Sequence, residues 1–289
     1  MMNWFSLTLI CFFLCGMQRF LYKVSAQRNC NTAWTPLSFM GTVALISTFL
    51  WFGSDEVLKN LPWLLLLSLI NSLTFFVDTI VTIEALRYLP TTVVYPVTRM
   101  SAVLVVIFSV VYFQDRLNPY QIAGIVLAIG VILTLTRFSE EEKREYGNIR
   151  KGLVLIVLAV LSGAVAAVSS KFAALYTNQM AFIALTYTLS MLFSLGLRKP
   201  FEKGGASPHY GEALLIGFIM GLVNFGAFYT LLKAMEIGPL SLIIPVVGMN
   251  FVIANILASI VYGERLTWLK AAGILMTVAS LLLMKLGQS

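Results

Sequence analysis

Two charged residues, Asp78 and Arg99, stand inside long apolar stretches of this 289-residue chain. An ionised side chain at the centre of a bilayer costs about 2.5–3.5 kcal/mol on insertion scales, so both residues are expected to face the interior of a helix bundle. A short turn joins their two stretches, which makes an Asp78–Arg99 ion pair feasible. Two interpretations stay open: a static structural pair, or a site where either residue binds a solute or a coupling proton.

Uncharged polar residues share these stretches and others further along the chain. Asn71, Asp78 and Thr82 lie close to one helical face, at spacings of seven and four residues. Such groups either bond helix to helix, at under about 1–2 kcal/mol each, or converge on a solute. The candidate substrate-binding residues are Asn71, Asp78, Tyr95, Arg99, Asn224, Tyr229 and Asn250.

Patterns for catalysis are missing from the sequence. His209 is the only histidine, which excludes HExxH zinc sites and Ser–His or Cys–His nucleophile systems. The sequence has no P-loop pattern, and Asp78 has no second membrane aspartate to form a protease pair. Cys11, Cys15 and Cys30 indicate neither a disulfide framework nor a metal site. We therefore expect no enzyme activity, no cofactor and no bound metal.

The elements that position these residues are apolar segments of membrane-spanning length. The chain is 59% hydrophobic and 11% charged, whereas a soluble domain is about a quarter charged. A helix needs about 20 apolar residues to cross the hydrocarbon core. The sequence predicts an all-α polytopic membrane protein with ten transmembrane helices. They lie at about 2–23, 33–53, 62–86, 91–113, 119–137, 151–175, 180–197, 210–233, 240–262 and 267–286.

The net charge of +7 comes from Lys and Arg residues between these blocks, so it indicates membrane topology rather than nucleic acid binding. Basic residues are concentrated in the loops after odd-numbered spans, which places those loops in the cytoplasm and both termini outside the cell membrane. The first span has no positive region before it and is interpreted as a transmembrane helix, not a signal peptide. Lys23 and Lys171 close spans one and six and are expected to reach the membrane interface.

The two halves of the chain are copies of one unit, because identical or similar residues recur at a constant offset of 149 positions. The matched pairs are Ala85 and Ala234, Pro90 and Pro239, Pro96 and Pro245, Met100 and Met249, Asp115 and Glu264, Arg116 and Arg265, Leu117 and Leu266, and Gly124 and Gly273. Five spans in each copy reverse the insertion of the second copy, giving two inverted five-helix repeats. We predict repeats at 1–137 and 151–289, joined by a charged linker at 138–150.

Pro96 and Pro245 lie about two turns inside spans four and nine. There, proline removes the hydrogen bond to the carbonyl four residues earlier and bends the helix. Those carbonyls belong to Thr92 and Ser241, which also form a pair at the same offset. Either these prolines only shape packing, or they act as hinges beside a polar cavity.

The AL-x-x-x-x-P turn, the proline six residues on, and the helix end at Gly263-Glu264-Arg265-Leu266 resemble the EamA-type domain of the drug/metabolite transporter superfamily. The first copy has the variant Gln114-Asp115-Arg116-Leu117. The resemblance covers nearly the whole chain as two repeats. It implies a ten-helix carrier in which helices three, four, eight and nine line a central cavity.

The predicted function is a secondary-active transporter, an exporter or exchanger of small organic metabolites such as amino acids or drug-like solutes. Alternating access about a central cavity is the expected mechanism. The expected partners are a small-molecule substrate, membrane lipid and a coupling proton, with the protein a monomer or homodimer. Two alternatives stay open: a flippase for a lipid-linked substrate and a non-transporting membrane scaffold.

Overall fold

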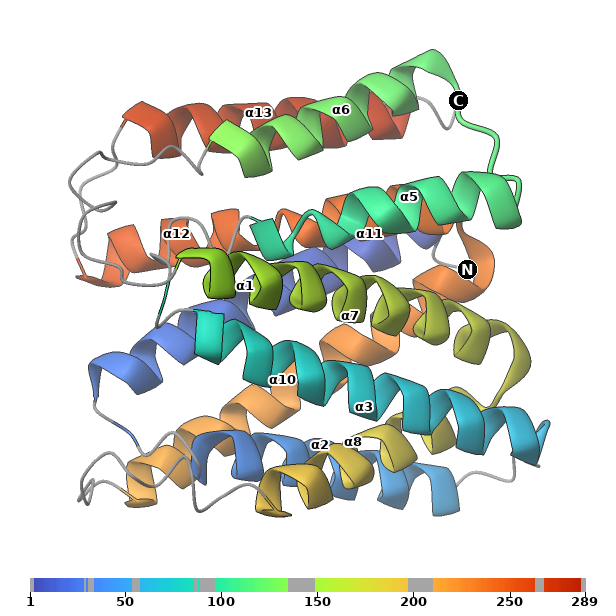
Figure 1. Ribbon diagram of the computed structural model, residues 1–289, viewed down its shortest axis with the longest axis vertical. Helices are drawn as coiled ribbons and strands as arrows, with labels where there is room; N and C mark the ends of the chain where they lie inside the picture. Colours follow the sequence, from blue (N-terminus) through green and yellow to red (C-terminus); the bar gives the residue numbers. More distant parts are fainter. Residues whose placement is uncertain are drawn as a thin grey trace. The chain divides into compact units, whose positions relative to one another are not determined.

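The computed structural model describes residues 3–28, 30, 34–53, 58–85, 88, 97–134, 149–196, 210–262 and 268–286. Among these residues there are helices and turns and no strand, which confirms the predicted all-α class for this part of the chain (Figure 1). The helices are α1 (Trp4–Gln27), α2 (Trp34–Phe52), α3 (Leu61–Ala85), α5 (Ser101–Tyr112), α6 (Pro119–Thr134), α7 (Ile149–Tyr176), α8 (Gln179–Gly196), α10 (Tyr210–Ile237), α11 (Leu240–Gly248), α12 (Phe251–Tyr262) and α13 (Trp268–Leu286).

Seven described helical stretches are long and apolar enough to cross a membrane. They are Trp4–Tyr22, Trp34–Phe52, Leu61–Asp78, Arg150–Tyr176, Gln179–Gly196, Tyr210–Ile237 and Leu240–Tyr262. Three shorter apolar stretches, Ser101–Tyr112, Pro119–Gly130 and Ala271–Leu286, fall at other predicted spans. Because these three are short, the count of ten crossings stays a prediction.

Large apolar side chains lie on the outer faces of the helices. Leu45 and Phe49 of α2 are 73% and 79% exposed, and Leu275 of α13 is 68% exposed. Exposed apolar surface of this kind is costly in water and favourable against lipid tails. The surface therefore agrees with an integral membrane protein.

The helices form two compact units, and each unit contains helices from both sequence copies. Unit 1 comprises residues 1–76 and 169–237, and unit 2 comprises residues 77–168 and 238–289. The boundaries fall inside α3 and α7, so each of these helices contributes to both units. Most of the predicted linker, 138–150, lies outside the described residues, and the division into repeats at that segment stays a prediction.

In unit 1, α10 packs closely against α1 and α2, and α2 packs against α8. Small residues permit the close approach of α10 to α2. A Cβ atom at Gly217 would lie 2.6 Å from the Thr35 carbonyl oxygen, and one at Gly221 would lie 2.5 Å from Thr42 Cβ. Two glycines four residues apart form a small-xxx-small face of the kind that brings membrane helices together.

In unit 2, α6 lies beside α13, and α5 packs against α11 (Figure 1). The Ser280 hydroxyl of α13 donates a hydrogen bond of 2.8 Å to the Gly124 carbonyl of α6. A Cβ atom at Gly124 would lie 3.1 Å from the Ser280 carbonyl oxygen. The pair α5–α11 places the helical parts of spans four and nine in one compact unit.

Candidate functional site

Span nine, predicted as one helix bent at Pro245, is divided into two helices. Helix α11 ends at Gly248 and α12 begins at Phe251, with a turn at Met249–Asn250 that we call the span-nine break. The Met249 amide donates to the Val246 carbonyl at 3.2 Å, and the Val252 amide donates to the Met249 carbonyl at 3.0 Å. Both are tight bonds between residues three apart, and such a stretch inside a helix marks a hinge or a strained segment.

Span four has a corresponding break at the position that the offset of 149 residues requires. A turn at Arg99–Met100, the span-four break, precedes α5. The Met100 amide donates to the Val97 carbonyl and the Val103 amide donates to the Met100 carbonyl, each at 2.9 Å. These two bonds match those of the span-nine break residue for residue.

Of the two predicted hinge prolines, the structure describes Pro245. Pro245 is buried inside α11, with the span-nine break beginning four residues after it. Pro96 and the candidate site residue Tyr95 lie outside the described residues. Pro245 cannot donate to the Ser241 carbonyl four residues before it, so the bend that it favours lies within α11, on the N-terminal side of the break.

Arg99, Asp78 and Asn250, three of the predicted site residues, belong to unit 2. Arg99 lies in the span-four break and is half-buried, and Asp78 is half-buried on α3. The ion pairs that the structure shows between described residues do not include one from Asp78 to Arg99. Both interpretations of these two residues, as a static pair and as a binding site, stay predictions.

Asn250 in the span-nine break is one of several buried polar residues of the described chain that have a side-chain atom without a hydrogen-bond partner. Its side chain is 4% exposed, and its Oδ1 atom has no hydrogen-bond partner among the described residues. A buried polar group left without a partner costs about 1–3 kcal/mol. Such a group calls for an explanation, and an unfilled ligand position is one.

Asp115 connects the start of α11 to the segment that follows α5. Its Oδ2 atom accepts hydrogen bonds from the Ser241 amide at 3.2 Å and the Ser241 hydroxyl at 2.6 Å. The Ser109 hydroxyl of α5 donates to the same oxygen at 2.5 Å. A carboxylate is stabilising at a helix N-terminus, where free N–H groups and the helix dipole favour negative charge.

The predicted site residues of unit 1 have hydrogen-bond or ring partners within that unit. Asn224 of α10 accepts a hydrogen bond from the Tyr187 hydroxyl at 2.5 Å and donates one to Gln18 Oε1 at 2.9 Å. Asn71 of α3 donates to the Ser169 and Ser170 hydroxyls of α7, both at 2.9 Å. These contacts agree with the alternative in which such residues bond helix to helix.

Tyr229 of α10 lies in an aromatic and basic environment. Its ring is nearly parallel to that of Phe225, with centroids 6.3 Å apart. The Lys233 ammonium lies 5.9 Å from the centre of the Tyr229 ring. These contacts hold the ring along α10, and a role in substrate binding stays a proposal.

Lys171, which was expected to reach the membrane interface, has a hydrogen-bond partner within the protein. The residue is 7% exposed and donates a hydrogen bond to the Met235 carbonyl in the last turn of α10. The last four carbonyls of a helix have no partner within it, and the helix dipole there favours positive charge. Lys171 therefore stabilises the C-terminus of α10.

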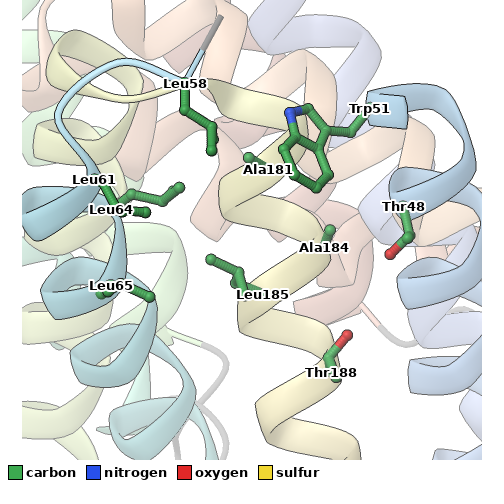
Figure 2. A pocket seen from close by; sticks show the side chains of 10 residues that line it. All are labelled: Thr48, Trp51, Leu58, Leu61, Leu64, Leu65, Ala181, Ala184, Leu185 and Thr188. Atoms are coloured by element: carbon green, nitrogen blue, oxygen red, sulfur yellow. The ribbon is translucent and has the colours of Figure 1, made fainter. Parts of the chain in front are cut away.

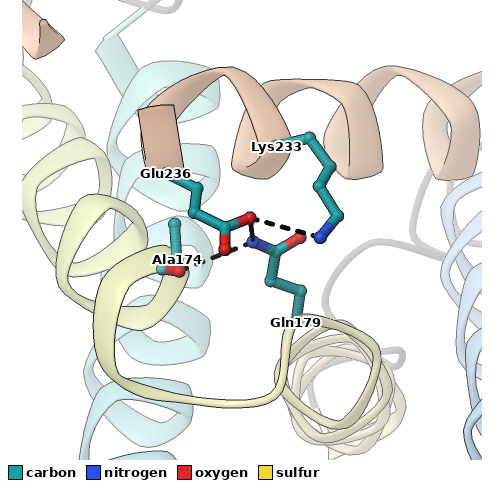
Figure 3. A network of polar contacts seen from close by, with 4 residues as sticks. All are labelled: Ala174, Gln179, Lys233 and Glu236. Carbon is teal, nitrogen blue, oxygen red and sulfur yellow. Dashed lines mark hydrogen bonds and ion pairs between the residues drawn. The ribbon is translucent and has the colours of Figure 1, made fainter. Parts of the chain in front are cut away.

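A second set of polar contacts lies near the same helix end (Figure 3). Gln179 Nε2 donates to Glu236 at 2.8 Å, and the Lys233 ammonium forms an ion pair of 3.2 Å with the same carboxylate oxygen. The Lys233 and Glu236 side chains are 41% and 42% exposed. An exposed pair of this kind contributes at most about 1 kcal/mol.

Comparison with known protein families decides the identity of the chain. The profile of the EamA-like transporter family matches residues 2–137 and again residues 150–286. The chain belongs to the EamA-like transporter family. Its two matches coincide with the two sequence copies, which confirms the resemblance and the repeat, and this family makes the protein a membrane transporter of small solutes.

Among solved structures, this transporter is similar in fold to a chain that is described as "Crystal structure of protein". The two chains share 16% sequence identity with a TM-score of 0.79, and the similarity covers 98% of each chain. At this identity the similarity shows the fold alone. A search of curated proteins found no match to the transporter.

A cavity in the described part of the transporter is lined by none of the predicted site residues. It has a volume of about 280 Å³ and lies among α2, α3 and α8 of unit 1 (Figure 2). Leucines form much of its wall, including Leu61, Leu64 and Leu65 of α3, while Thr48 and Thr188 supply hydroxyl groups. An apolar wall of this kind suits lipid tails better than a polar solute.

Sequence analysis missed several polar residues of the transporter's helices. Gln18 and Tyr187 complete the hydrogen bonds of Asn224. Arg19, one helical turn after Cys15 on α1, is near enough to act electrostatically on that thiol. The available signal was a polar amide and a guanidinium inside the first apolar stretch, where such residues are rare.

Proposed function

We propose that the protein is a secondary-active transporter of small organic metabolites, such as amino acids or drug-like solutes, in the cell membrane. It works as an exporter or exchanger by alternating access about a central cavity, with both chain termini outside. The paired breaks in spans four and nine are the observation that carries this proposal. Two symmetry-related helices with matching turns are suited to bend together while a solute passes.

The residues around the breaks have distinct roles in this mechanism. Arg99 is the candidate contact for an anionic group such as a carboxylate, because guanidinium groups bind carboxylates with two parallel hydrogen bonds. Asp78 is the candidate carrier of a coupling proton, since a half-buried carboxyl in a membrane helix can gain or lose a proton during transport. Asn250 is a third candidate contact.

Flux through purified, reconstituted protein tests the proposal. Vesicles containing the protein should show saturable uptake or release of at least one member of a panel of charged and neutral metabolites. Arg99→Gln should impair flux of anionic solutes more than that of neutral ones. Vesicles made with heat-denatured protein are the matched control. If flux across the whole panel equals that control, the transport proposal fails and the scaffold alternative gains support.

A flippase for a lipid-linked substrate is a second candidate, and the cavity in Figure 2 is the observation that favours it. Its neighbours Leu61 and Leu65 are 49% and 53% exposed, so the apolar wall continues onto a surface suited to lipid. A fluorescent lipid in the outer leaflet distinguishes the candidates. Protein-dependent movement to the inner leaflet supports the flippase, whereas solute flux without lipid movement supports the metabolite transporter.

A further inference from the structure

Of the three predicted site asparagines, Asn71 and Asn224 have side-chain partners on neighbouring helices, whereas the Asn250 Oδ1 atom has none in the described part of the chain. Asn71 donates to Ser169 and Ser170, and Asn224 contacts Tyr187 and Gln18. Asn250 Oδ1 is buried and has no partner among the described residues. The first two asparagines therefore have a structural explanation that Asn250 does not have.

The chemistry of the Asn250 amide oxygen indicates which groups it could bind. The span-nine break joins the C-terminal end of α11 to the N-terminal end of α12, so helix ends of opposite polarity meet there and the helix dipoles favour neither sign of charge. Carbonyls at an interrupted membrane helix and a side-chain amide oxygen are acceptors that coordinate cations. No donor of this chain occupies Asn250 Oδ1 within the described part.

The space at the break also differs from its counterpart in the first copy. A Cβ atom at Gly248 would meet no heavy atom within 4 Å. The offset of 149 residues maps Gly248 to Arg99 in the span-four break. The first copy thus carries its own cationic side chain at this position, while the second copy has open space at Gly248 and, two residues further on, an unpartnered oxygen.

We propose that the span-nine break is a cation site, in which Asn250 Oδ1 binds either a primary ammonium group or a small alkali metal ion. The inference rests on the proposed transport function, because the ammonium would belong to the transported solute and the metal ion would be its coupling ion. Arg99 supplies the equivalent positive charge in the span-four break.

Thermal unfolding of the full-length protein in detergent tests the site. The probes are sodium chloride and methylammonium chloride, each compared with N-methylglucamine chloride at equal ionic strength. A cation that binds only the folded state raises the unfolding temperature with its concentration. A rise with sodium alone identifies a coupling ion, and a rise with methylammonium alone identifies a substrate amine. Equal unfolding temperatures in all three salts overturn the proposal.

Substitutions at Asn250 test whether a cation-dependent rise of the unfolding temperature depends on its Oδ1 atom. Asn250→Leu should weaken the apparent cation affinity by at least about tenfold, and Asn250→Asp should strengthen it, because hydrogen bonds to charged groups are the stronger ones. Asn224→Leu is the matched control, since it removes the same amide from a partnered position. An Asn250→Leu protein that keeps the full cation response contradicts the proposal.

Gly248→Arg places an arginine in the span-nine break, at the position that corresponds to Arg99 in the span-four break. The variant should lose its response to added cations, while its unfolding temperature without them stays at or above that of the native protein. A Gly248→Arg protein that folds and responds as the native chain does contradicts the proposal. Solute flux without any cation response would reject the site and leave the transport function standing, whereas cation binding without flux would reject the transport function.

Discussion

Asp115 accepts two hydrogen bonds from Ser241, one from its main-chain amide at 3.2 Å and one from its hydroxyl at 2.6 Å. The two residues lie in different sequence copies and within the same compact unit. Asp115 belongs to the charged motif of the first copy, and Ser241 lies in the first turn of α11. The motif at one helix end thus fixes the start of the helix that carries Pro245 and leads to the span-nine break.

Removing the Asp115 carboxylate should destabilise the protein. Asp115→Asn takes the charge from the oxygen that accepts from Ser109 and Ser241, at an expected cost of about 1–3 kcal/mol in the free energy of unfolding. Unfolding in mixed detergent micelles measures this change. Ser241→Ala and the double variant complete a cycle, in which a coupling near zero would show that the contact contributes nothing.

Replacing Pro245 should slow transport without weakening the fold. Pro245→Ala restores the possibility of a straight helix, and a bias of about 1.4 kcal/mol toward that state would lower the population of the bent state about tenfold. Flux in vesicles should fall while the unfolding temperature stays equal or rises. Pro239→Ala, at the N-cap of α11, is the control and should leave flux nearly unchanged. Equal flux in both variants would argue against a hinge at Pro245.

Replacing Asn224 should affect stability more than transport affinity. Asn224→Leu leaves the Tyr187 hydroxyl and Gln18 without their partner, at a cost of about 1–2 kcal/mol. Tyr187→Phe removes the same contact from the other side and should cost a similar amount. The measurements are the free energy of unfolding and the half-saturating solute concentration. A large rise of that concentration, with unchanged stability, would instead place Asn224 in the substrate site.

Lys171→Met should destabilise the protein by about 1.5–3 kcal/mol, because the Met235 carbonyl loses a charged donor inside the bundle. Lys233→Met is the matched control. Its ammonium is part of an exposed ion pair, so the expected change is below about 1 kcal/mol. Parallel unfolding curves measure both changes. Equal losses for the two variants would show that the Lys171 hydrogen bond contributes no more stability than an exposed ion pair.

Hydropathy and the constant offset were sufficient to predict the helical class and the repeat, and the helices lie at the predicted spans. The turns at 99–100 and 249–250 follow Pro96 and Pro245 in the sequence by a few residues, and the hinge role of these prolines stays a prediction. These features could be predicted because lipid contact requires long apolar stretches and proline acts on its own helix.

Which asparagine is partnered could not be predicted from the sequence. Asn71 has its partners at Ser169 and Ser170, roughly a hundred residues along the chain, and no local pattern specifies that contact. Lys171 likewise resembled an interface lysine because it ends an apolar stretch, and only packing against α10 shows its carbonyl partner. Distant contacts of this kind follow from how the helices assemble.

Accessibility of the span-nine break tests the central claim that this turn contacts the transported solute. Gly248→Cys, in a protein whose Cys11, Cys15 and Cys30 are replaced, is exposed in intact vesicles to a maleimide that does not cross membranes. Ile243→Cys, on the buried part of α11, is the control for an inaccessible position. We predict that Gly248→Cys reacts and that a transported solute changes its rate. A Gly248→Cys protein as unreactive as Ile243→Cys, with and without solute, would contradict the account.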